Sequence, residues 1–454
     1  MEFDLKEFRE ALLNLVEDKK YSEIKTLLAD MNAVDVAQLF ESDFSEDVVT
    51  RLFRLLPKEL AAETFAEMEP ETQQMLITGF SDSELKEVVD ELYVDDAVDL
   101  VEEMPANVVK RILSQVDVEK RRLINNILKY PEDSAGSIMT TEYVELRPHM
   151  TREDAILQIR RSGIEKETIN SCYVCGKERM LLGVVTIRQL ILADDEETME
   201  ELMDDNVISA NTMDDQETVA MTMSRYDLLA LPIVDTEGRL VGIVTVDDVL
   251  DVMQEETTED IAKMNAILPS DKPYLRRTTW ELYKSRIPWL LLLMISATFT
   301  GMIITGFQNA LAKYVVLTAY IPMLMDTGGN SGSQASVSVI RSISLGEVKF
   351  SDLFRVVFKE VRVAILCGIT LAVCNFVKLM VLDRLDMMVA FAVCLTLVVT
   401  VFCAKIIGAT LPLCAFRIGF DPAVMASPFI TTLVDAISLL VYFAIATNLL
   451  GLTT

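Results

Sequence analysis

The sequence predicts a multidomain protein with an all-α superhelical N-terminal domain, an α+β tandem domain pair, a connecting (plug) helix and an all-α transmembrane domain of five helices. Three observations support this fold class: charge is segregated, two central stretches resemble each other, and long apolar stretches fill the C-terminal part. The expected boundaries are 1–130 for the N-terminal domain, 131–202 and 203–250 for the tandem pair, 246–270 for the connecting helix and 271–454 for the transmembrane domain.

Charge divides the chain into two unlike parts. Residues 287–454 hold 8 of the 70 acidic and 10 of the 41 basic side chains, so residues 1–286 carry a net charge of about −31. Such an acidic part does not bind nucleic acid or anionic lipid, but it attracts cations. The N-terminus lacks the apolar core of a signal peptide, so we expect residues 1–286 to stay in the cytoplasm.

The seven cysteines fit a reducing compartment. Five lie in apolar stretches, where cysteine serves as a small hydrophobic residue. Cys172 and Cys175 form a lone Cys-x-x-Cys pair, and the chain has a single histidine, His149. Because a structural zinc site needs four ligands, this pair gives little support for zinc.

Residues 1–130 show a helical pattern with faint internal repetition. The stretch 56–65 recurs 48 residues later as 104–113, with proline second in both, and a half-step copy starts at Phe80. A period near 24 residues predicts short helices stacked in a solenoid-like array at right angles.

Residues 131–255 change to β-rich segments that occur twice. Residues 182–190 match 241–249, and 139–146 match 203–210. Together with the phrase Leu-Pro-Ile-Val-Asp-Thr-Glu-Gly-Arg-Leu-Val-Gly-Ile-Val-Thr-Val-Asp-Asp from residue 231, this region resembles a tandem pair of CBS domains. The resemblance implies an α+β module that dimerises and often binds adenosine nucleotides.

The resemblance to CBS domains also implies a nucleotide site. An acidic residue three positions after a threonine often holds the ribose, and the second repeat has Thr245 and Asp248. The first repeat has Thr186 and Gln189 and so departs from the pattern. ATP binding therefore stays open at this point.

The segment 246–268 joins the tandem pair to the membrane part and is acidic. Its carboxylates repel at i, i+4 spacing, while its apolar residues favour a helix. A solvated acidic face is the plain interpretation. Its position beside the first span, opposite further acids on the N-terminal domain, favours a role in which divalent cations draw acidic surfaces together and move the helix.

Five stretches are apolar enough to cross a bilayer, at 287–311, 314–340, 357–381, 387–416 and 422–450. The second and fourth are long and carry Gly, Ser, Pro and Thr, so we expect tilt, kinks or partial unwinding there. Ten basic residues flank one side and three the other, which places the N-terminal part in the cytoplasm and the C-terminus outside a cytoplasmic membrane.

Asp435 is the only charged side chain between residues 424 and 451. A carboxylate at bilayer depth is costly and tends to mark an ion or proton path. Because five helices are few for a pore, we expect a conduit between two copies, with two Asp435 side chains holding a hydrated Mg²⁺. The alternative is an ion pair with Lys405. Asn330, in a Gly-Gly-Asn stretch, offers a neutral oxygen ligand, although that stretch could also serve helix packing.

The order of these parts resembles the MgtE family of magnesium channels over essentially the whole chain. The resemblance implies a homodimer that passes Mg²⁺ and closes when cytoplasmic Mg²⁺ is high. It adds Asp421 and Ser427 to Asp435 and Asn330 at the pore. It implies cytoplasmic metal ligands at Glu63, Asp95, Asp99, Asp215, Glu217, Asp227, Asp247, Asp251, Glu255, Glu256, Glu259 and Asp260.

Two other functions compete with a gated Mg²⁺ channel. Asp435 could serve a proton- or sodium-coupled divalent cation transporter as a proton relay. The tandem pair could instead report nucleotide state in a membrane sensor that does not transport. An enzyme is least expected, because the sequence shows no nucleophile and base pair and no phosphate-binding loop. Oxygen ligands alone do not separate Mg²⁺ from Mn²⁺ or Co²⁺.

Overall fold

The structure is a computed structural model that describes residues 5–42, 44–163, 166–270, 272, 274–425 and 427–451. It divides into two compact units, Met1–Met253 and Gln254–Thr454. Each unit is described by itself.

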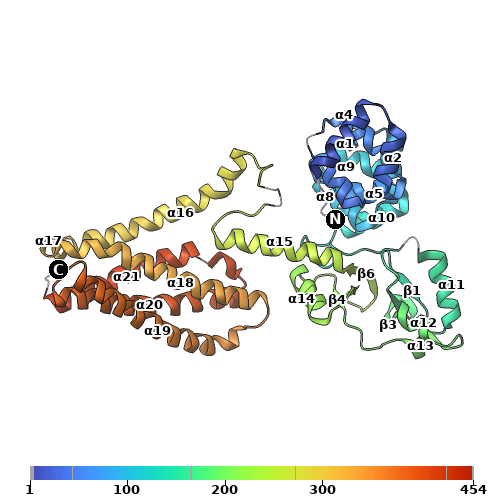
Figure 1. The fold of residues 1–454 in the computed structure, drawn as a ribbon. Helices are drawn as coiled ribbons and strands as arrows, with labels where there is room; N and C mark the ends of the chain where they lie inside the picture. The colour runs from blue at the N-terminus through green and yellow to red at the C-terminus, as the bar shows by residue number, and fades with distance from the viewer. Residues whose placement is uncertain are drawn as a thin grey trace. The chain divides into compact units, whose positions relative to one another are not determined.

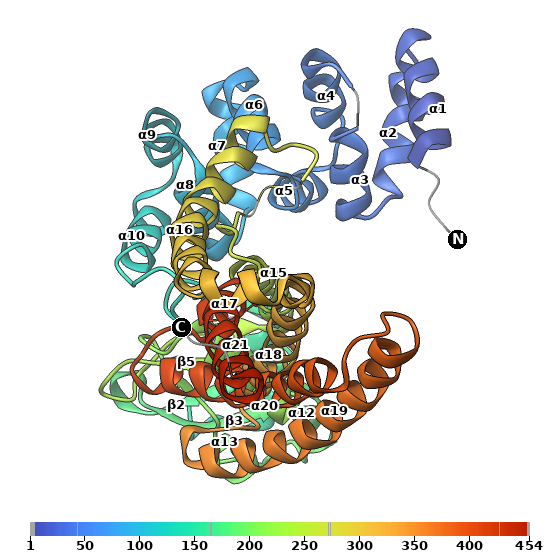
Figure 2. The same ribbon diagram turned by 90° about the vertical axis from the view of Figure 1, so that its left-hand side faces the viewer.

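The first unit begins with ten short helices that follow one another in chain order along an arc (Figure 2). The predicted repetition is confirmed, because Pro57 and Pro105 stand at the N-caps of the fifth and ninth helices. Ser81 starts the seventh helix with a capping box to Glu84. The helices are α1 Leu5–Glu17, α2 Tyr21–Ala29, α3 Ala33–Phe40, α4 Glu46–Phe53, α5 Lys58–Ala66, α6 Pro70–Gly79, α7 Asp82–Glu91, α8 Val94–Glu103, α9 Ala106–Gln115 and α10 Val118–Ile127.

The helical array is held by one continuous apolar core. Phe53, Phe65 and Phe80 form its aromatic centre, with ring centroids 5.3 to 6.5 Å apart. Each comes from a different step of the repeat, so neighbouring repeats bury one another as expected for a solenoid.

The tandem α+β pair contains two sheets with the same topology. In each, the first strand runs parallel to the second and the second antiparallel to the third. This internal duplication confirms the predicted pair. The elements are β1 Val144–Leu146, α11 Arg152–Ser162, β2 Ser171–Cys175, η2 Lys177–Arg179, β3 Leu181–Thr186, α12 Ile187–Leu192, α13 Met199–Leu202, β4 Ala210–Asn211, α14 Gln216–Tyr226, β5 Ala230–Val234 and β6 Leu240–Thr245.

The connecting helix α15 runs without a break from Val246 to Met264 (Figure 1). Val249 and Val252 are buried in the apolar core of the first unit. The last turns of α15 belong to the second unit. The boundary between the two units therefore falls within α15.

The second unit is helical. Four of its described helical stretches are long and apolar enough to cross a membrane: Thr279–Gly306, Phe350–Val381, Met387–Arg417 and Pro422–Leu450. The elements are α16 Thr279–Gly306, α17 Gln308–Lys313, η3 Val315–Tyr320, α18 Ile321–Ser344, η4 Phe350–Asp352, α19 Leu353–Val381, α20 Met387–Arg417, η5 Pro422–Met425 and α21 Ser427–Leu450.

The second expected span differs from its prediction. It is helix α18, which starts at Ile321 after a 3₁₀ stretch and not at residue 314, and its glycines, serines and amides leave it outside the four apolar stretches. Of the expected tilt, kinks or partial unwinding, the unwinding is not observed, because α18 and α20 are continuous helices. Both pack closely on α21.

The close approach of α18 and α20 depends on Gly408. A Cβ atom at this position would lie 2.2 Å from the backbone oxygen of Gly332. A backbone oxygen inside a continuous helix moves only with the helix, so this contact sets the separation of α18 and α20.

Gly408→Ala should therefore lower the apparent melting temperature of the detergent-solubilised chain, since overpacking costs typically about 1–3 kcal/mol. Gly301→Ala on α16 is the matched control, because a Cβ there meets no heavy atom of the described residues within 4 Å. The measurement is the monodisperse fraction that survives heating, by size-exclusion chromatography. Equal melting of the two variants would contradict the packing role of Gly408.

Candidate cation sites

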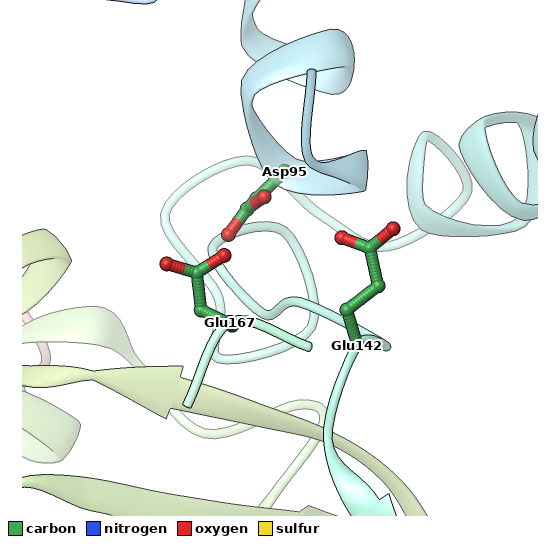
Figure 3. Close-up of side chains that lie close together, drawn as sticks. All are labelled: Asp95, Glu142 and Glu167. Atoms are coloured by element: carbon green, nitrogen blue, oxygen red, sulfur yellow. The ribbon is translucent and has the colours of Figure 1, made fainter. Parts of the chain in front are cut away.

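Three carboxylates from separate segments of the first unit meet at one point. Asp95 lies on α8, Glu142 precedes β1, and Glu167 lies in the loop before β2. One oxygen from each lies within 4.8 Å of the others, and the side chains point toward one another (Figure 3). This group, named here the triad, joins the helical domain to the first CBS repeat.

Backbone contacts hold the triad in place. The Val94 amide donates to Glu142 Oε2 at 3.1 Å, so Glu142 satisfies a free N–H at the start of α8. The Glu167 amide donates to the backbone oxygen of Glu142 at 2.9 Å. Asp95 follows Val94 directly and is only 8% exposed. Two loops and one helix start therefore bring the three carboxylates together.

Burial and mutual repulsion disfavour ionised carboxylates here. Burial, and then the charges of Asp248 and Asp96, raise the pKa of Glu167 to about 8. The same two causes raise the pKa of Asp99 to about 7, although part of its side chain is exposed. Burial is also the main cause that raises the pKa of Asp95 well above its ordinary value. In the same way, burial raises the pKa values of Asp96 and Asp248 to about 6.

Such a group suits a hard divalent cation. Mg²⁺ takes oxygen ligands, often one or two carboxylates with several waters, and the triad offers three carboxylates. One bound cation would supply the positive charge that the cluster lacks. Asp95 and Asp99 were expected from the sequence, whereas Glu142 and Glu167 were not. Glu142 and Glu167 are recognised only because two loops come close together in the fold, and no local sequence motif predicts that approach.

The other expected residues of the first unit have varied settings. Glu63 is exposed on α5, and its charge acts on Tyr93. Asp247 and Asp251 are exposed on α15, and after burial their charges raise the pKa of Glu67. These two therefore belong to the same acidic surface as the triad.

Three expected ligands lie at the ends of α14. Asp215 is its N-cap and accepts a hydrogen bond from the Glu217 amide at 2.9 Å. Asp227 ends the helix with φ of 52°, a left-handed conformation that aspartate tolerates better than most residues. These positions have clear structural roles, and they are not members of the triad.

A cavity of about 470 Å³ opens in the CBS pair. Its lining combines Thr186 and Arg188 of the first repeat with Tyr173 and Asp227. Thr245 and Asp248, the residues proposed for a nucleotide, are not part of this lining. Thr245 instead donates its hydroxyl proton to Asp248 at 2.5 Å, and the Asp248 charge acts on the acidic surface described above.

The C-terminal part of α15 contains an ion-pair cluster within the second unit. Lys263 Nζ lies 2.7 Å from both Glu259 and Asp421, and these carboxylates raise its pKa although burial opposes them. Asp260 accepts a hydrogen bond from Ser344 at 3.2 Å. The lysine thus ties α15 to the loop that precedes α21. Glu255 and Glu256 lie one turn earlier on the same helix.

Asp435 lies half-buried on α21, and its Oδ1 atom is buried with no hydrogen-bond partner among the described residues. The alternative role as partner of Lys405 is wrong, because Lys405 Nζ lies 3.7 Å from Glu360. Asn330 is exposed on α18. Ser427 begins α21, and its side chain lies outside the part of the chain that the structure describes.

The Cys-x-x-Cys pair is buried on β2. Burial raises the pKa of both thiols, Cys172 and Cys175, to about 12. The two side chains belong to different apolar clusters, where each serves as a small hydrophobic residue.

The order of the domains, the long apolar helices and the carboxylate within one of them are typical of a membrane transport protein, here with an acidic N-terminal half. Three family profiles match: an MgtE intracellular N domain over 31–133, CBS domains over 135–196 and 199–255, and a divalent cation transporter domain, MgtE, over 321–445. The chain is similar to two proteins named magnesium transporter MgtE. It is 37% identical to the one from Thermus thermophilus, over 87% of this chain and 88% of that protein. It is 33% identical to the one from Bacillus subtilis, over 96% of both proteins.

Solved structures agree. The cytosolic domain of the Mg²⁺ channel MgtE in complex with ATP matches with a TM-score of 0.51 and 35% identity, covering 54% of this chain and 99% of that one. The soluble part of a magnesium transporter matches with a TM-score of 0.52 and 31% identity, covering 56% and 99%. The chain belongs to the MgtE family of divalent cation transporters.

The raised pKa of Glu167 predicts exchange of protons for metal. At pH 7 a carboxyl with a pKa of about 8 is mostly protonated, and a bound cation favours its ionised form. Adding Mg²⁺ to weakly buffered protein at pH 7 should release protons, and the Mg²⁺ affinity of the first unit should fall as pH falls below 8. Potentiometric titration measures the release.

Glu167→Gln should release fewer protons than the parent chain. Asp205→Asn is the control, because Asp205 is an exposed acid outside the triad. Equal release from Glu167→Gln and the parent would show that Glu167 is not a ligand.

Proposed function

We propose that the chain is a Mg²⁺ channel of the cytoplasmic membrane that closes when cytoplasmic Mg²⁺ binds its acidic surfaces. The relatives named above are magnesium transporters, which supports transport over catalysis. The observation that carries the proposal is Asp435, a carboxylate inside an apolar helix with a buried oxygen and no cationic partner among the described residues. An intramembrane carboxylate in that state needs a cation.

A polar stripe on α18 supports a pore between two copies. Asp326, Asn330, Gln334 and Ser338 recur every four residues and are all exposed in a single chain. Lipid tails cannot satisfy such groups, so the stripe must face water or protein. A homodimer with α18 and α21 of each copy around a twofold axis places the stripe and Asp435 on a shared wet path.

The orientation follows from charge. In the proposed topology α16 runs outward, and α18, α19, α20 and α21 alternate after it. Basic residues are concentrated on the side of residues 1–286. The N-terminal part then lies in the cytoplasm, where the triad meets cytoplasmic Mg²⁺, and the C-terminus lies outside.

Closure follows from electrostatics on α15. Its first turns carry Asp247 and Asp251 on the acidic surface of the first unit, and its last turn carries Lys263, bound to the loop before α21. Mg²⁺ bound to the acidic surface relieves repulsion and favours the arrangement in which the carboxylates lie close together. Because Asp247 and Asp251 lie on α15, that arrangement holds the first turns of the helix at the acidic surface.

The cavity in the CBS pair is proposed to take an adenine nucleotide. A solved MgtE cytosolic domain at 35% identity is described in complex with ATP. Arg188 and Thr186 in the cavity lining supply a cation and a hydroxyl for phosphate and ribose. The nucleotide would then sit beside the first repeat and not at Thr245 and Asp248.

Asp435→Asn should abolish Mg²⁺ flux into proteoliposomes, because it removes the pore charge while keeping the side-chain shape. Glu347→Gln, an exposed acid in the loop after α18, is the control and should conduct like the parent. Fluorescent Mg²⁺ indicators inside the vesicles report the flux. Parent flux that follows an imposed pH gradient would favour the coupled transporter instead, and an Asp435→Asn protein with parent flux would refute the pore assignment.

The double variant Asp95→Asn with Glu167→Gln should stay open at cytoplasmic Mg²⁺ concentrations that close the parent. Both ligands are lost, so Mg²⁺ no longer distinguishes the two arrangements as strongly. Patch recordings with cytoplasmic Mg²⁺ titrated should show a midpoint raised by at least about tenfold, a loss of 1.4 kcal/mol. Asp205→Asn, which removes one carboxylate outside the triad, is the control, and closure at the parent midpoint in the double variant would exclude the triad as sensor.

A further inference from the structure

A second carboxylate lies in the membrane half, on α18. Asp326 is the sixth residue of the helix, beyond the first turn where the helix dipole favours an acid. Its side chain is exposed in a single chain. Among the described residues neither Asp326 nor Asp435 forms an ion pair with lysine or arginine, while the buried Lys405 is engaged by Glu360. The charge of Asp326 is therefore explained neither by the helix dipole nor by an ion pair.

Contacts between α18 and α21 show where Asp326 lies along the axis of this helix pair relative to the residues of α21. A Cβ atom at Gly329 would lie 2.8 Å from Thr431, and Ser333 Oγ lies 3.5 Å from Thr431 Oγ1. Gly328 meets Ser438 and Gly332 meets Ile430 in the same way, so the helices run antiparallel.

From the contact of Gly329 with Thr431, Asp326 is three residues back on α18 and Asp435 four residues forward on α21. In antiparallel helices both steps lead in the same direction, by about 4.5 and 6 Å at 1.5 Å per residue. Residues three and four apart share a helix face, so both carboxylates stay on the side of the contact. Asp326 and Asp435 thus lie at one level, meaning a similar position along the axis of the helix pair. The charge of Asp326 acts on Asp435.

The surroundings of this level are polar and incompletely paired. Asp435 Oδ1 and the hydroxyl of Thr400, which is 1% exposed, are buried without hydrogen-bond partners. The Thr400 side chain packs against Gly328, two residues from Asp326. Unpaired oxygens at bilayer depth are costly unless water or a cation meets them.

We propose that Asp326 is a second carboxylate of the cation path, which binds the hydrated divalent cation together with Asp435 and sets its affinity. This inference rests on the proposed transport function. Two copies would contribute four carboxylates at one level. Mg²⁺ dehydrates reluctantly, so a ring of carboxylates that accepts hydrogen bonds from its bound waters suits it better than close direct ligation.

The test measures Mg²⁺ flux into proteoliposomes against external Mg²⁺ for the full chain. Asp326→Asn should raise the half-saturating concentration at least about tenfold, which corresponds to 1.4 kcal/mol. Asp326→Glu should restore most of the affinity, because it returns the charge. Block by hexaamminecobalt(III), an inert analogue of hydrated Mg²⁺, should weaken in Asp326→Asn to a similar extent, which a purely structural role of Asp326 would not cause.

Asp383→Asn controls for outer surface charge, since the amide oxygen can still accept the Tyr320 hydroxyl bond seen at 2.9 Å. Half-saturation of Asp326→Asn within about twofold of the parent would overturn the proposal while leaving Mg²⁺ transport intact. Absent flux in the parent chain would instead refute the proposed function. If Asp326→Asn does not elute as a folded protein, Asp326→Ser is measured in the same way, since serine is common along α18.

Discussion

Carboxylates held close together without enough cations are the constraint on which this chain depends. Asp95, Glu142 and Glu167 meet within 4.8 Å of one another in partly buried surroundings, and their charges oppose that arrangement. Helix starts and backbone hydrogen bonds keep the carboxylates in place, so the cost is carried by the fold. An arrangement of this kind is stable to the degree that protons or divalent cations neutralise it, and its stability is thereby tied to the ion that the family transports.

The carboxylates of the membrane half also need neutralising charge, but they do not all find it in the same way. Glu360 and Lys405 neutralise each other between α19 and α20, which is what a buried charge needs for structural purposes. Asp435 has no such partner among the described residues, and the nearby charge of Asp326 is of the same sign. Within the part of the chain that the structure describes, one intramembrane acid is thus compensated and two are not. That contrast within one bundle is a stronger argument for a cation path than the presence of a charge alone.

Local signals predicted much of the fold, and contacts between distant segments explain what they missed. Prolines at 57 and 105 marked helix starts because proline needs no N–H donor there, and the CBS repeats were visible as duplicated strands. Glu142 and Glu167 were missed because their meaning arises only when two loops approach α8. The unwinding expected in α18 did not occur, because its glycines remove side-chain bulk where α20 and α21 approach while the helix keeps its own hydrogen bonds.

The connecting helix shows why a regulator and a conduit can share one chain. Val249 and Val252 anchor its start by apolar burial, and Lys263 anchors its end by a short ion pair with Asp421 while also pairing with Glu259 on the same helix. The first anchor is insensitive to ions, whereas the second consists of carboxylates that a divalent cation would also bind. Mg²⁺ near the end of α15 must therefore compete with the lysine ammonium, a compact cation fixed to the chain. In the proposed function the tie between α15 and the loop before α21 then responds to cation concentration by direct competition.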